Sequence, residues 1–89
     1  MIMQAEVIMY STRFCPYCMR ARKLLKSKKI IFKEILIGND KSLRKEMEQK
    51  SGQTSVPQIF INGKSIGGYD DMAQLNYDGT LDTLLKEKI

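Results

Sequence analysis

The 89-residue sequence contains no histidine, no tryptophan and only two cysteines. Without histidine, neither a Cys-His nucleophile pair nor a histidine-ligated metal site can form. A closed structural zinc site would need further ligands of a kind that this chain lacks, and the cysteines are too few for the disulfide-stapled class of secreted domain. We therefore expect no metal site, and any disulfide here would serve chemistry rather than architecture.

Long apolar runs are also missing, and none of the runs present approaches the length of a membrane span. The composition, with 43% hydrophobic and 28% charged residues, is that of an ordinary globular chain. Residues 1–10 are interrupted by Gln4 and Glu6 and lack the basic start of a secretory signal. The sequence thus predicts a single domain over residues 1–89, without membrane attachment, in the reducing cytoplasm.

The formal net charge is +5, and its placement is uneven. The positive side chains gather in one segment, namely Arg13, Arg20, Arg22, Lys23, Lys26, Lys28 and Lys29. Aromatic residues are not interleaved with them and no nucleic-acid-reading motif is present, so we expect no nucleic-acid partner. Most of this cluster is interpreted as a solvated helix face, and the rest would attract an anionic thiol substrate.

The two cysteines stand three positions apart, in Cys15-Pro16-Tyr17-Cys18. A strand-like run at residues 6–10 precedes them, and a helical pattern at residues 16–27 follows. Pro16 fits the first helical turn, where its missing N–H has no partner in any case.

The helical spacing separates the two thiols. Cys18, Ala21 and Leu25 recur on one face and are predicted to point into the core, which leaves Cys15 exposed at the helix tip. A thiolate at a helix N-terminus is stabilised by unpaired N–H groups and the helix dipole, and Arg13 with its basic neighbours would add to that field. The pattern predicts a lowered pKa for Cys15, as nucleophile, and a buried thiol at Cys18 that resolves mixed disulfides.

The rest of the chain alternates strands and helices. The predicted elements are a strand at 30–37, a largely exposed helix at 41–50, hairpin strands at 58–61 and 64–66, a helix capped by Asp70 or Asp71, and a last helix from Thr80. The hairpin turn is Asn62-Gly63, whose residues tolerate the positive φ angles of a tight turn. The strand-helix-strand start implies a parallel pair, so the fold class is α/β.

This order of elements, with the cysteine pair at the start of the first helix, resembles the thioredoxin superfamily. Three motifs resemble those of small dithiol glutaredoxins: residues 15–18, the Ser-Val-Pro-Gln-Ile-Phe-Ile of 55–61 and the Gly-Gly-Tyr-Asp-Asp of 67–71. The resemblance implies a thioredoxin-like fold, with a four-stranded mixed sheet flanked by helices, and a glutathione-dependent thiol-disulfide oxidoreductase. The Trp-Cys-Gly-Pro-Cys of thioredoxins themselves is absent.

The resemblance also implies a glutathione site. Its members would be Arg13, Tyr17, Ser55, Val56, Pro57, Gly68, Tyr69, Asp70 and Asp71. The Val56-Pro57 bond would be cis, the Val56 backbone would pair with the cysteinyl unit, and Asp70 would face the α-amino group. Many relatives have lysine where this chain has Thr12, and Arg13 is the candidate to replace its contact with the glycyl carboxylate.

Glutathione would be a co-substrate, with no tightly bound cofactor. The other partners would be disulfide-containing or glutathionylated proteins, and the chain would act on them as a monomer. Two other functions stay open at this point. One is a thioredoxin-like reductase fed by a flavoprotein. The other is an iron-sulfur carrier in which Cys15 and glutathione from two chains share a cluster, although Pro16-Tyr17 argues against it.

Overall fold

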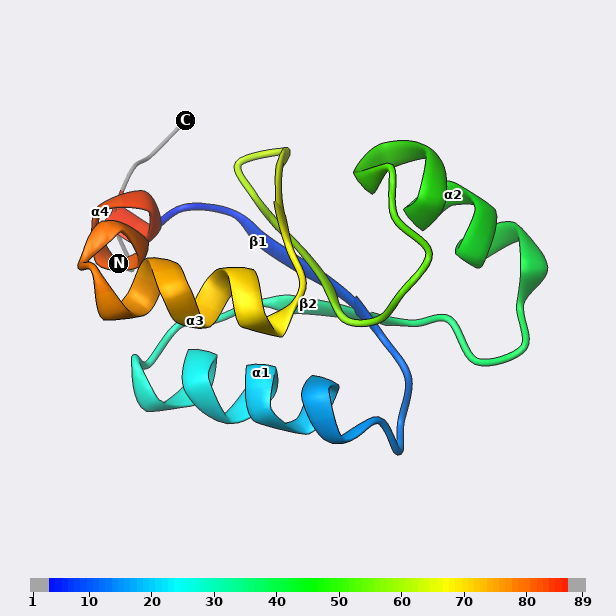
Figure 1. Ribbon diagram of the computed structural model, residues 1–89, viewed down its shortest axis with the longest axis horizontal. Coiled ribbons are helices and arrows are strands. Elements are labelled where there is room, and N and C mark those ends of the chain that lie inside the picture. Colours follow the sequence, from blue (N-terminus) through cyan, green and yellow to red (C-terminus); the bar gives the residue numbers. More distant parts are fainter. Residues whose placement is uncertain (1–3, 87–89) are drawn as a thin grey trace.

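The computed structural model describes residues 4–86, which form four strands and four helices (Figure 1). The elements are β1 Val7–Ser11, α1 Pro16–Ser27, β2 Lys33–Leu36, α2 Lys41–Ser51, β3 Gln58–Ile61, β4 Lys64–Gly67, α3 Tyr69–Tyr77 and α4 Thr80–Lys86. Residues 1–3 and 87–89 of the predicted domain lie outside the described part. None of the helices within residues 4–86 combines the length and apolar character that a membrane crossing requires.

The four strands form one mixed sheet in the order β2-β1-β3-β4. β1 pairs with β2 in parallel and with β3 antiparallel, and β3 pairs antiparallel with β4. The parallel pair is joined through α1, as a right-handed crossover requires. The predicted α/β architecture with a four-stranded mixed sheet and flanking helices is confirmed.

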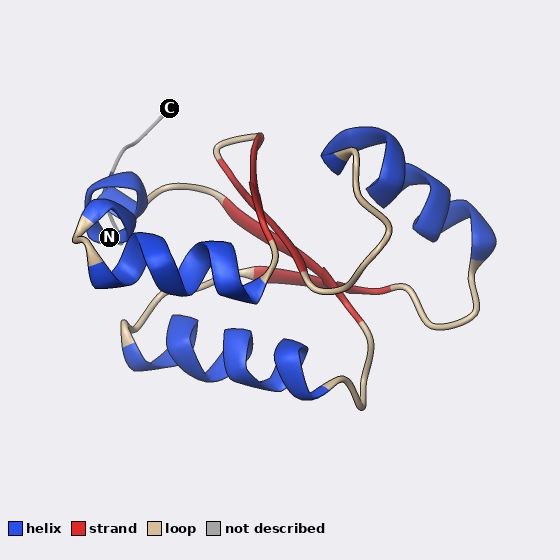
Figure 2. Cartoon of the chain, in the orientation of Figure 1, coloured by secondary structure: helices blue, strands red, loops and turns tan. Residues whose placement is uncertain are grey.

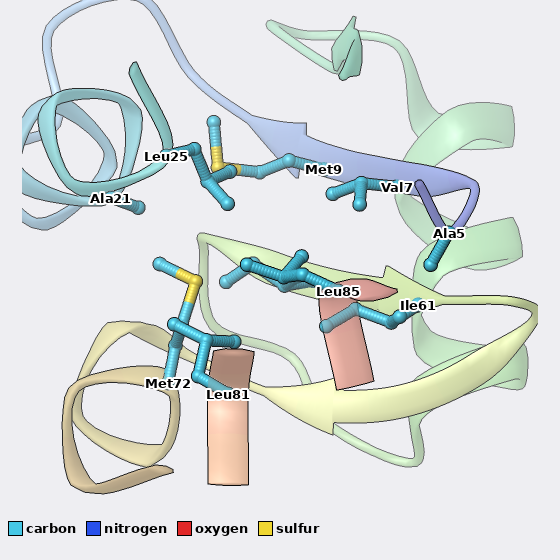
Figure 3. Close-up of a cluster of buried hydrophobic side chains, with 10 residues drawn as sticks. Ala5, Val7, Met9, Ala21, Leu25, Ile61, Met72, Leu81 and Leu85 are labelled. Atoms are coloured by element: carbon cyan, nitrogen blue, oxygen red, sulfur yellow. The ribbon is translucent and has the colours of Figure 1, made fainter. Parts of the chain in front are cut away.

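Alternation along β1 and β3 creates two apolar faces on the sheet. Val7 and Met9 of β1, with Ile59 and Ile61 of β3, join the larger core, which also takes side chains from α1, α3 and α4 (Figure 3). Ala21 and Leu25 supply the contribution of α1, as their spacing predicted. Figures 1 and 2 show α1 and α3 side by side, running in the same direction, on this face of the sheet.

Among the helices of residues 4–86, α2 is the one that covers the opposite face (Figure 1). Met47 of α2 is fully buried against Tyr10 and Phe60, whose rings meet edge to face at 5.6 Å. The N-cap of helix α2 is Asp40, whose carboxylate accepts the N–H of Leu43 at 3.0 Å. The carboxyl end of β1, at the centre of the sheet, leads through a short loop into the cysteine motif at the start of α1.

Strand β2 is shorter than predicted, at Lys33–Leu36 instead of 30–37. The backbone of Ile31 has no strand partner because both its N–H and its carbonyl bond to the side-chain amide of Gln4, at 3.0 and 2.7 Å. An isoleucine-rich run indicates a strand, but it does not reveal that a side chain takes the backbone hydrogen bonds that a neighbouring strand would otherwise make. The prediction of the hairpin turn is confirmed, with positive φ at Asn62 and Gly63.

Candidate active site

The first helix begins at the cysteine motif, and Cys15 is its N-cap. Its backbone is extended, with φ −80° and ψ 122°, and its sulfur accepts the N–H of Cys18 at 3.3 Å. Serine, threonine or aspartate oxygen usually takes this place. Pro16 occupies the first turn as predicted, so the orphan amides of the helix start are directed at a sulfur atom.

The two thiols differ in burial. Cys18 is completely buried, as its helical spacing predicted, whereas Cys15 is partly buried. Cys15 was predicted to be exposed at the helix tip, but it is only partly exposed: the carbonyl of Val56 lies 3.8 Å from its sulfur. Helical periodicity identifies the inward face of a helix but not the loop that packs over its end.

The pKa of the Cys15 thiol is lowered below its ordinary value. Burial alone would raise this pKa, but backbone hydrogen bonds from Cys18 and Tyr17, a side-chain hydrogen bond with Cys18 and the charge of Arg22 outweigh it. The direction confirms the prediction. The charge that contributes to the lower pKa of Cys15, after the hydrogen bonds, is that of Arg22 rather than the expected Arg13.

Burial raises the pKa of the Cys18 thiol to about 11, and the neighbouring Cys15 sulfur adds to the rise. At neutral pH, Cys18 therefore keeps its proton while Cys15 more readily loses its own. Only a thiolate attacks a disulfide, so the pair consists of one activated and one dormant sulfur.

The loop that covers Cys15 contains a cis peptide bond between Val56 and Pro57, as the resemblance implied. Gln58, the first residue of β3, is fully buried, and its side-chain amide donates to the Ser55 carbonyl at 2.9 Å and to Gln53 Oε1 at 3.3 Å. This amide ties the loop to the sheet and fixes the backbone of Val56 beside the reactive sulfur.

A groove of about 310 Å³ runs from the redox turn to the start of α3, and we call it the Pro57 groove. Its lining consists of Tyr17, Gln53, Ser55, Val56, Pro57, Gly68, Tyr69, Asp70 and Asp71. The rings of Tyr17 and Tyr69 lie 6.5 Å apart across it. The structure thus brings together every predicted glutathione contact except Arg13, and it adds Gln53, which sequence reasoning missed.

The start of α3 forms one end of this groove. Its N-cap is Gly68, and the carboxylate of Asp71 accepts the Gly68 N–H at 3.0 Å. The prediction that Asp70 or Asp71 is the cap residue is wrong, because both stand inside the first turn; Asp71 nevertheless satisfies an end amide, and Asp70 is exposed at the groove. Gly67 precedes them with φ +111°, and a Cβ there would lie 2.3 Å from the Asp71 carboxylate.

Arg13 lies elsewhere. It lines a second groove, of about 650 Å³, together with Phe14, Cys15 and Leu36, so Cys15 separates it from the Pro57 groove. Arg22, in contrast, was predicted to belong to a solvated helix face, but its side chain is only 18% exposed and pairs with Glu34. No signal in the sequence links position 22 with position 34, because the contact joins a helix to a strand on the far side of a loop.

Comparison with known proteins places this geometry in context. Residues 7–66 match the glutaredoxin family. Glutaredoxin 3 of Escherichia coli strain K12 is 49% identical over 82 residues, which cover 92% of this chain and 99% of the relative. A glutaredoxin of Pseudomonas aeruginosa is 46% identical over 79 residues, covering 89% and 94% of the two chains.

Solved structures agree with the sequences. The solution structure of glutaredoxin from Brucella melitensis superposes with a TM-score of 0.83 at 44% identity, covering 96% of this chain and 92% of that one. The crystal structure of a buckwheat glutaredoxin-glutathione complex superposes with a TM-score of 0.84 at 30% identity, covering 91% and 76%. The similarity therefore extends through the cysteine turn, the Pro57 loop and the start of α3.

Proposed function

The chain belongs to the glutaredoxin family and is a glutathione-dependent thiol-disulfide oxidoreductase, and within this activity we propose that Cys15 is the nucleophile and Cys18 the resolving thiol. The observation that carries this assignment is the opposite shift of the two pKa values, lowered at Cys15 and raised to about 11 at Cys18. The more acidic thiol is also the one that is only partly buried.

The proposed cycle on a glutathionylated substrate is two successive thiol exchanges. The Cys15 thiolate attacks the glutathionyl sulfur, the mixed disulfide breaks, and the substrate leaves as a thiolate that takes up a proton. A second glutathione thiolate then attacks the same glutathionyl sulfur, which releases the Cys15 thiolate and glutathione disulfide. In net terms, one free glutathione is consumed: the substrate disulfide is reduced to a thiol, and the glutathionyl group leaves with that glutathione as glutathione disulfide.

On a protein disulfide, Cys15 would form the mixed disulfide with one substrate sulfur. Cys18 would then lose its proton and attack the Cys15 sulfur, closing the Cys15-Cys18 bridge and freeing the reduced protein. Two glutathione molecules reopen the bridge. Glutaredoxins have potentials of roughly −200 to −230 mV, close to that of a glutathione pool, so this reduction is thermodynamically accessible.

We propose that the glutathionyl group occupies the Pro57 groove. The backbone of Val56 would pair with the cysteinyl unit as a short added strand, beside the Cys15 sulfur. Asp70, exposed at the groove, would accept from the α-amino group, while the ring of Tyr17 flanks the tripeptide. Ser55, Pro57, Gly68, Tyr69 and Asp71 complete the walls.

The glycyl carboxylate needs a donor within this groove. Gln53 lines the groove and its Oε1 accepts from Gln58, so its Nε2 amide is the part of the side chain that can donate to a ligand. Arg13 would have to reach around Cys15 to make the same contact. We therefore assign the carboxylate first to Gln53 and keep Arg13 as a longer-range attraction.

We further propose that the partners are disulfide-containing or glutathionylated proteins, that the chain acts as a monomer with glutathione as a co-substrate instead of a tightly bound cofactor, and that it works in the cytoplasm. Its cysteine usage supports this compartment, because a redox pair without structural disulfides is typical of a reducing environment.

A coupled assay tests the function. A glutathionylated peptide should be turned over when glutathione, glutathione reductase and NADPH are supplied, and should not be when thioredoxin reductase and NADPH replace the glutathione system. Turnover with the flavoprotein alone would favour a thioredoxin-like reductase. A purified protein with a visible absorption band that disappears when glutathione is removed would instead favour the iron-sulfur carrier.

A further inference from the structure

Among the basic residues near the redox turn, Arg22 has an unusual environment. It stands four positions after Cys18 on α1, so the two side chains leave the helix on the same side. Its side chain is 18% exposed and that of its partner Glu34, on β2, is 24% exposed. This partly desolvated ion pair lies near enough to both cysteines for the Arg22 charge to act on them, and neither member lines the Pro57 groove.

The Arg22 guanidinium makes two directed contacts. Its Nε donates to Glu34 Oε2, and its Nη2 donates to the Thr12 carbonyl at 2.9 Å. The same Glu34 oxygen accepts the hydroxyl of Ser11, which is fully buried at the end of β1, at 2.5 Å. These contacts connect α1, β2 and the end of β1 to the loop that leads to Cys15.

Other bases of the segment are engaged differently. Arg20 stacks over the ring of Tyr17 at 5.4 Å, and Lys28 pairs with Asp82 on α4 at 2.7 Å. Lys23 and Lys26 are exposed. A solvated charge is screened and mobile, whereas a charge held by two hydrogen bonds at reduced exposure acts on its surroundings from a fixed position.

We propose that Arg22, oriented by Glu34, is a positioning residue for the redox pair: it holds the Thr12 loop and places one fixed positive charge near Cys15 and Cys18. The proposal rests on the function assigned above, with Cys15 as nucleophile. An arginine suits this role because its planar fork serves a carboxylate and a carbonyl at once, which a lysine ammonium does with less geometric control.

The electrostatics support this role. The charge of Arg22 lowers the pKa of both thiols, and a backbone hydrogen bond from Thr12 reaches the Cys18 sulfur. The charged and titratable groups around the pair are Arg22 and Tyr17 on α1, Glu34 on β2, Arg13 on the connecting loop, and Tyr69, Asp70 and Asp71 on α3. Of these, only Arg22 and Glu34 form a pair that also contacts the Thr12 loop.

The test compares charge-neutral variants in a Cys18→Ser background, where the titrating thiol is Cys15 alone. The rate of alkylation by iodoacetamide is measured against pH for Arg22→Gln, Glu34→Gln and the matched control Lys26→Gln, which removes an exposed charge one turn along the same helix. Arg22→Gln should raise the pH midpoint of Cys15 alkylation by roughly half a unit, so alkylation below that midpoint should be about threefold slower. Lys26→Gln should raise the midpoint by much less.

Glu34→Gln distinguishes positioning from simple support of the fold. Glutamine keeps an acceptor for Arg22 but removes the opposing charge, so the midpoint should not rise, even though both Arg22→Gln and Glu34→Gln lower the urea midpoint of unfolding. Arg22→Lys should recover most of the Arg22→Gln shift. An Arg22→Gln midpoint equal to that of Lys26→Gln, or a rise in both Arg22→Gln and Glu34→Gln, would overturn the proposal.

Two measurements keep the outcome decisive. If Arg22→Gln fails to fold by circular dichroism, Arg22→Lys and Glu34→Gln keep the proposal falsifiable, because a clearly raised Cys15 midpoint in either variant would overturn it. If alkylation of the Cys18→Ser parent shows no thiolate titration below the ordinary thiol range, then the assignment of Cys15 as nucleophile fails, which is distinct from failure of the Arg22 role.

Discussion

Helices α1 and α3 both direct their N-terminal ends at the Pro57 groove, but their positive ends are neutralised differently. At α3, Asp70 and Asp71 stand in the first turn and Asp71 accepts an end amide. At α1 there is no acidic residue in the first turn, and the acceptor is the sulfur of Cys15. One helix has a permanent counter-charge, whereas the other obtains one only when its thiol ionises.

In the binding mode proposed above, this difference lets two similar helix ends contact opposite ends of one ligand. The uncompensated end of α1 favours an anion and so activates a nucleophile. The compensated end of α3 leaves the exposed carboxylate of Asp70 available to a cation. The groove between them thus begins beside an electron-rich sulfur, 3.8 Å from the Val56 carbonyl, and has a negative charge at its other end. This distribution suits the proposed positions of the thiol and the α-amino group of glutathione.

The largest effect should follow from removing the sulfur at α1. Cys15→Ser should abolish exchange, by about a thousandfold or more, because a serine hydroxyl is not ionised at neutral pH. Cys18→Ser should keep turnover of a glutathionylated peptide and lose most turnover of a protein disulfide. Parallel coupled assays on both substrates measure this, and an equal loss in the two variants on the glutathionylated peptide would contradict the division of roles.

Gly67→Ala should displace the Asp71 carboxylate from the start of α3. The new Cβ would collide with the Asp71 carboxylate and would sit at φ +111°, so the free energy of unfolding should fall by about 2–3 kcal/mol. Gly63→Ala is the matched control, since φ there is also positive but a Cβ meets no atom within 4 Å, and it should lose only about 1 kcal/mol. Urea unfolding compares them, and equal losses would remove the contact with Asp71 from the explanation.

The two thiols should titrate on opposite sides of the ordinary thiol value. Since the pKa of Cys15 is lowered and that of Cys18 is raised to about 11, Cys15 should be alkylated at least tenfold faster at neutral pH. As pH rises through the Cys18 pKa, the folded state loses stability, because the unfolded thiol ionises earlier than the folded one. Mass spectrometry of alkylated peptides across pH follows both sites, and faster labelling of Cys18 would contradict the assignment.

The smallest expected effect tests the ligand-facing charge at α3. Asp70→Asn should raise the KM for a glutathionylated peptide by a few-fold to about tenfold with little change in kcat, as for a partly exposed charged contact. Asp78→Asn is the matched control at the other end of α3, where asparagine can still accept the Thr80 N–H. An unchanged KM in Asp70→Asn would remove Asp70 from the site.

Local patterns predicted most of the fold. Helix α1 and strand β3 have their predicted bounds, because a proline at the first turn and an Asn-Gly hairpin are strong local signals. Strand β2 is shorter because a distant glutamine side chain, Gln4, replaces its ladder, and no local pattern contains that information.

The site divides in the same way. The redox pair was predicted from the cysteine spacing at a helix start, and the residues of the Pro57 groove other than Gln53 were implied by the resemblance of three contiguous motifs. Gln53, Gln58 and Arg22 act through contacts that depend on how the loops are packed, and the placement of Arg13 depends on the turn of the chain before Cys15. Motifs identify reactive atoms, whereas the surrounding electrostatics emerge only from tertiary packing.

The use of a cysteine as the N-cap of α1 makes the oxidation state of the protein part of its folding thermodynamics. A disulfide sulfur carries no charge, so the attraction between the thiolate and the helix end is present only in the reduced protein. A closed thermodynamic cycle links two differences. The difference in unfolding free energy between the reduced and oxidised forms equals the difference in reduction potential of the cysteine pair between the folded and unfolded chain, about 30 mV for each 1.4 kcal/mol. The difference between the melting temperatures of the two forms therefore reports how far folding shifts the potential at which Cys15 and Cys18 give up two electrons.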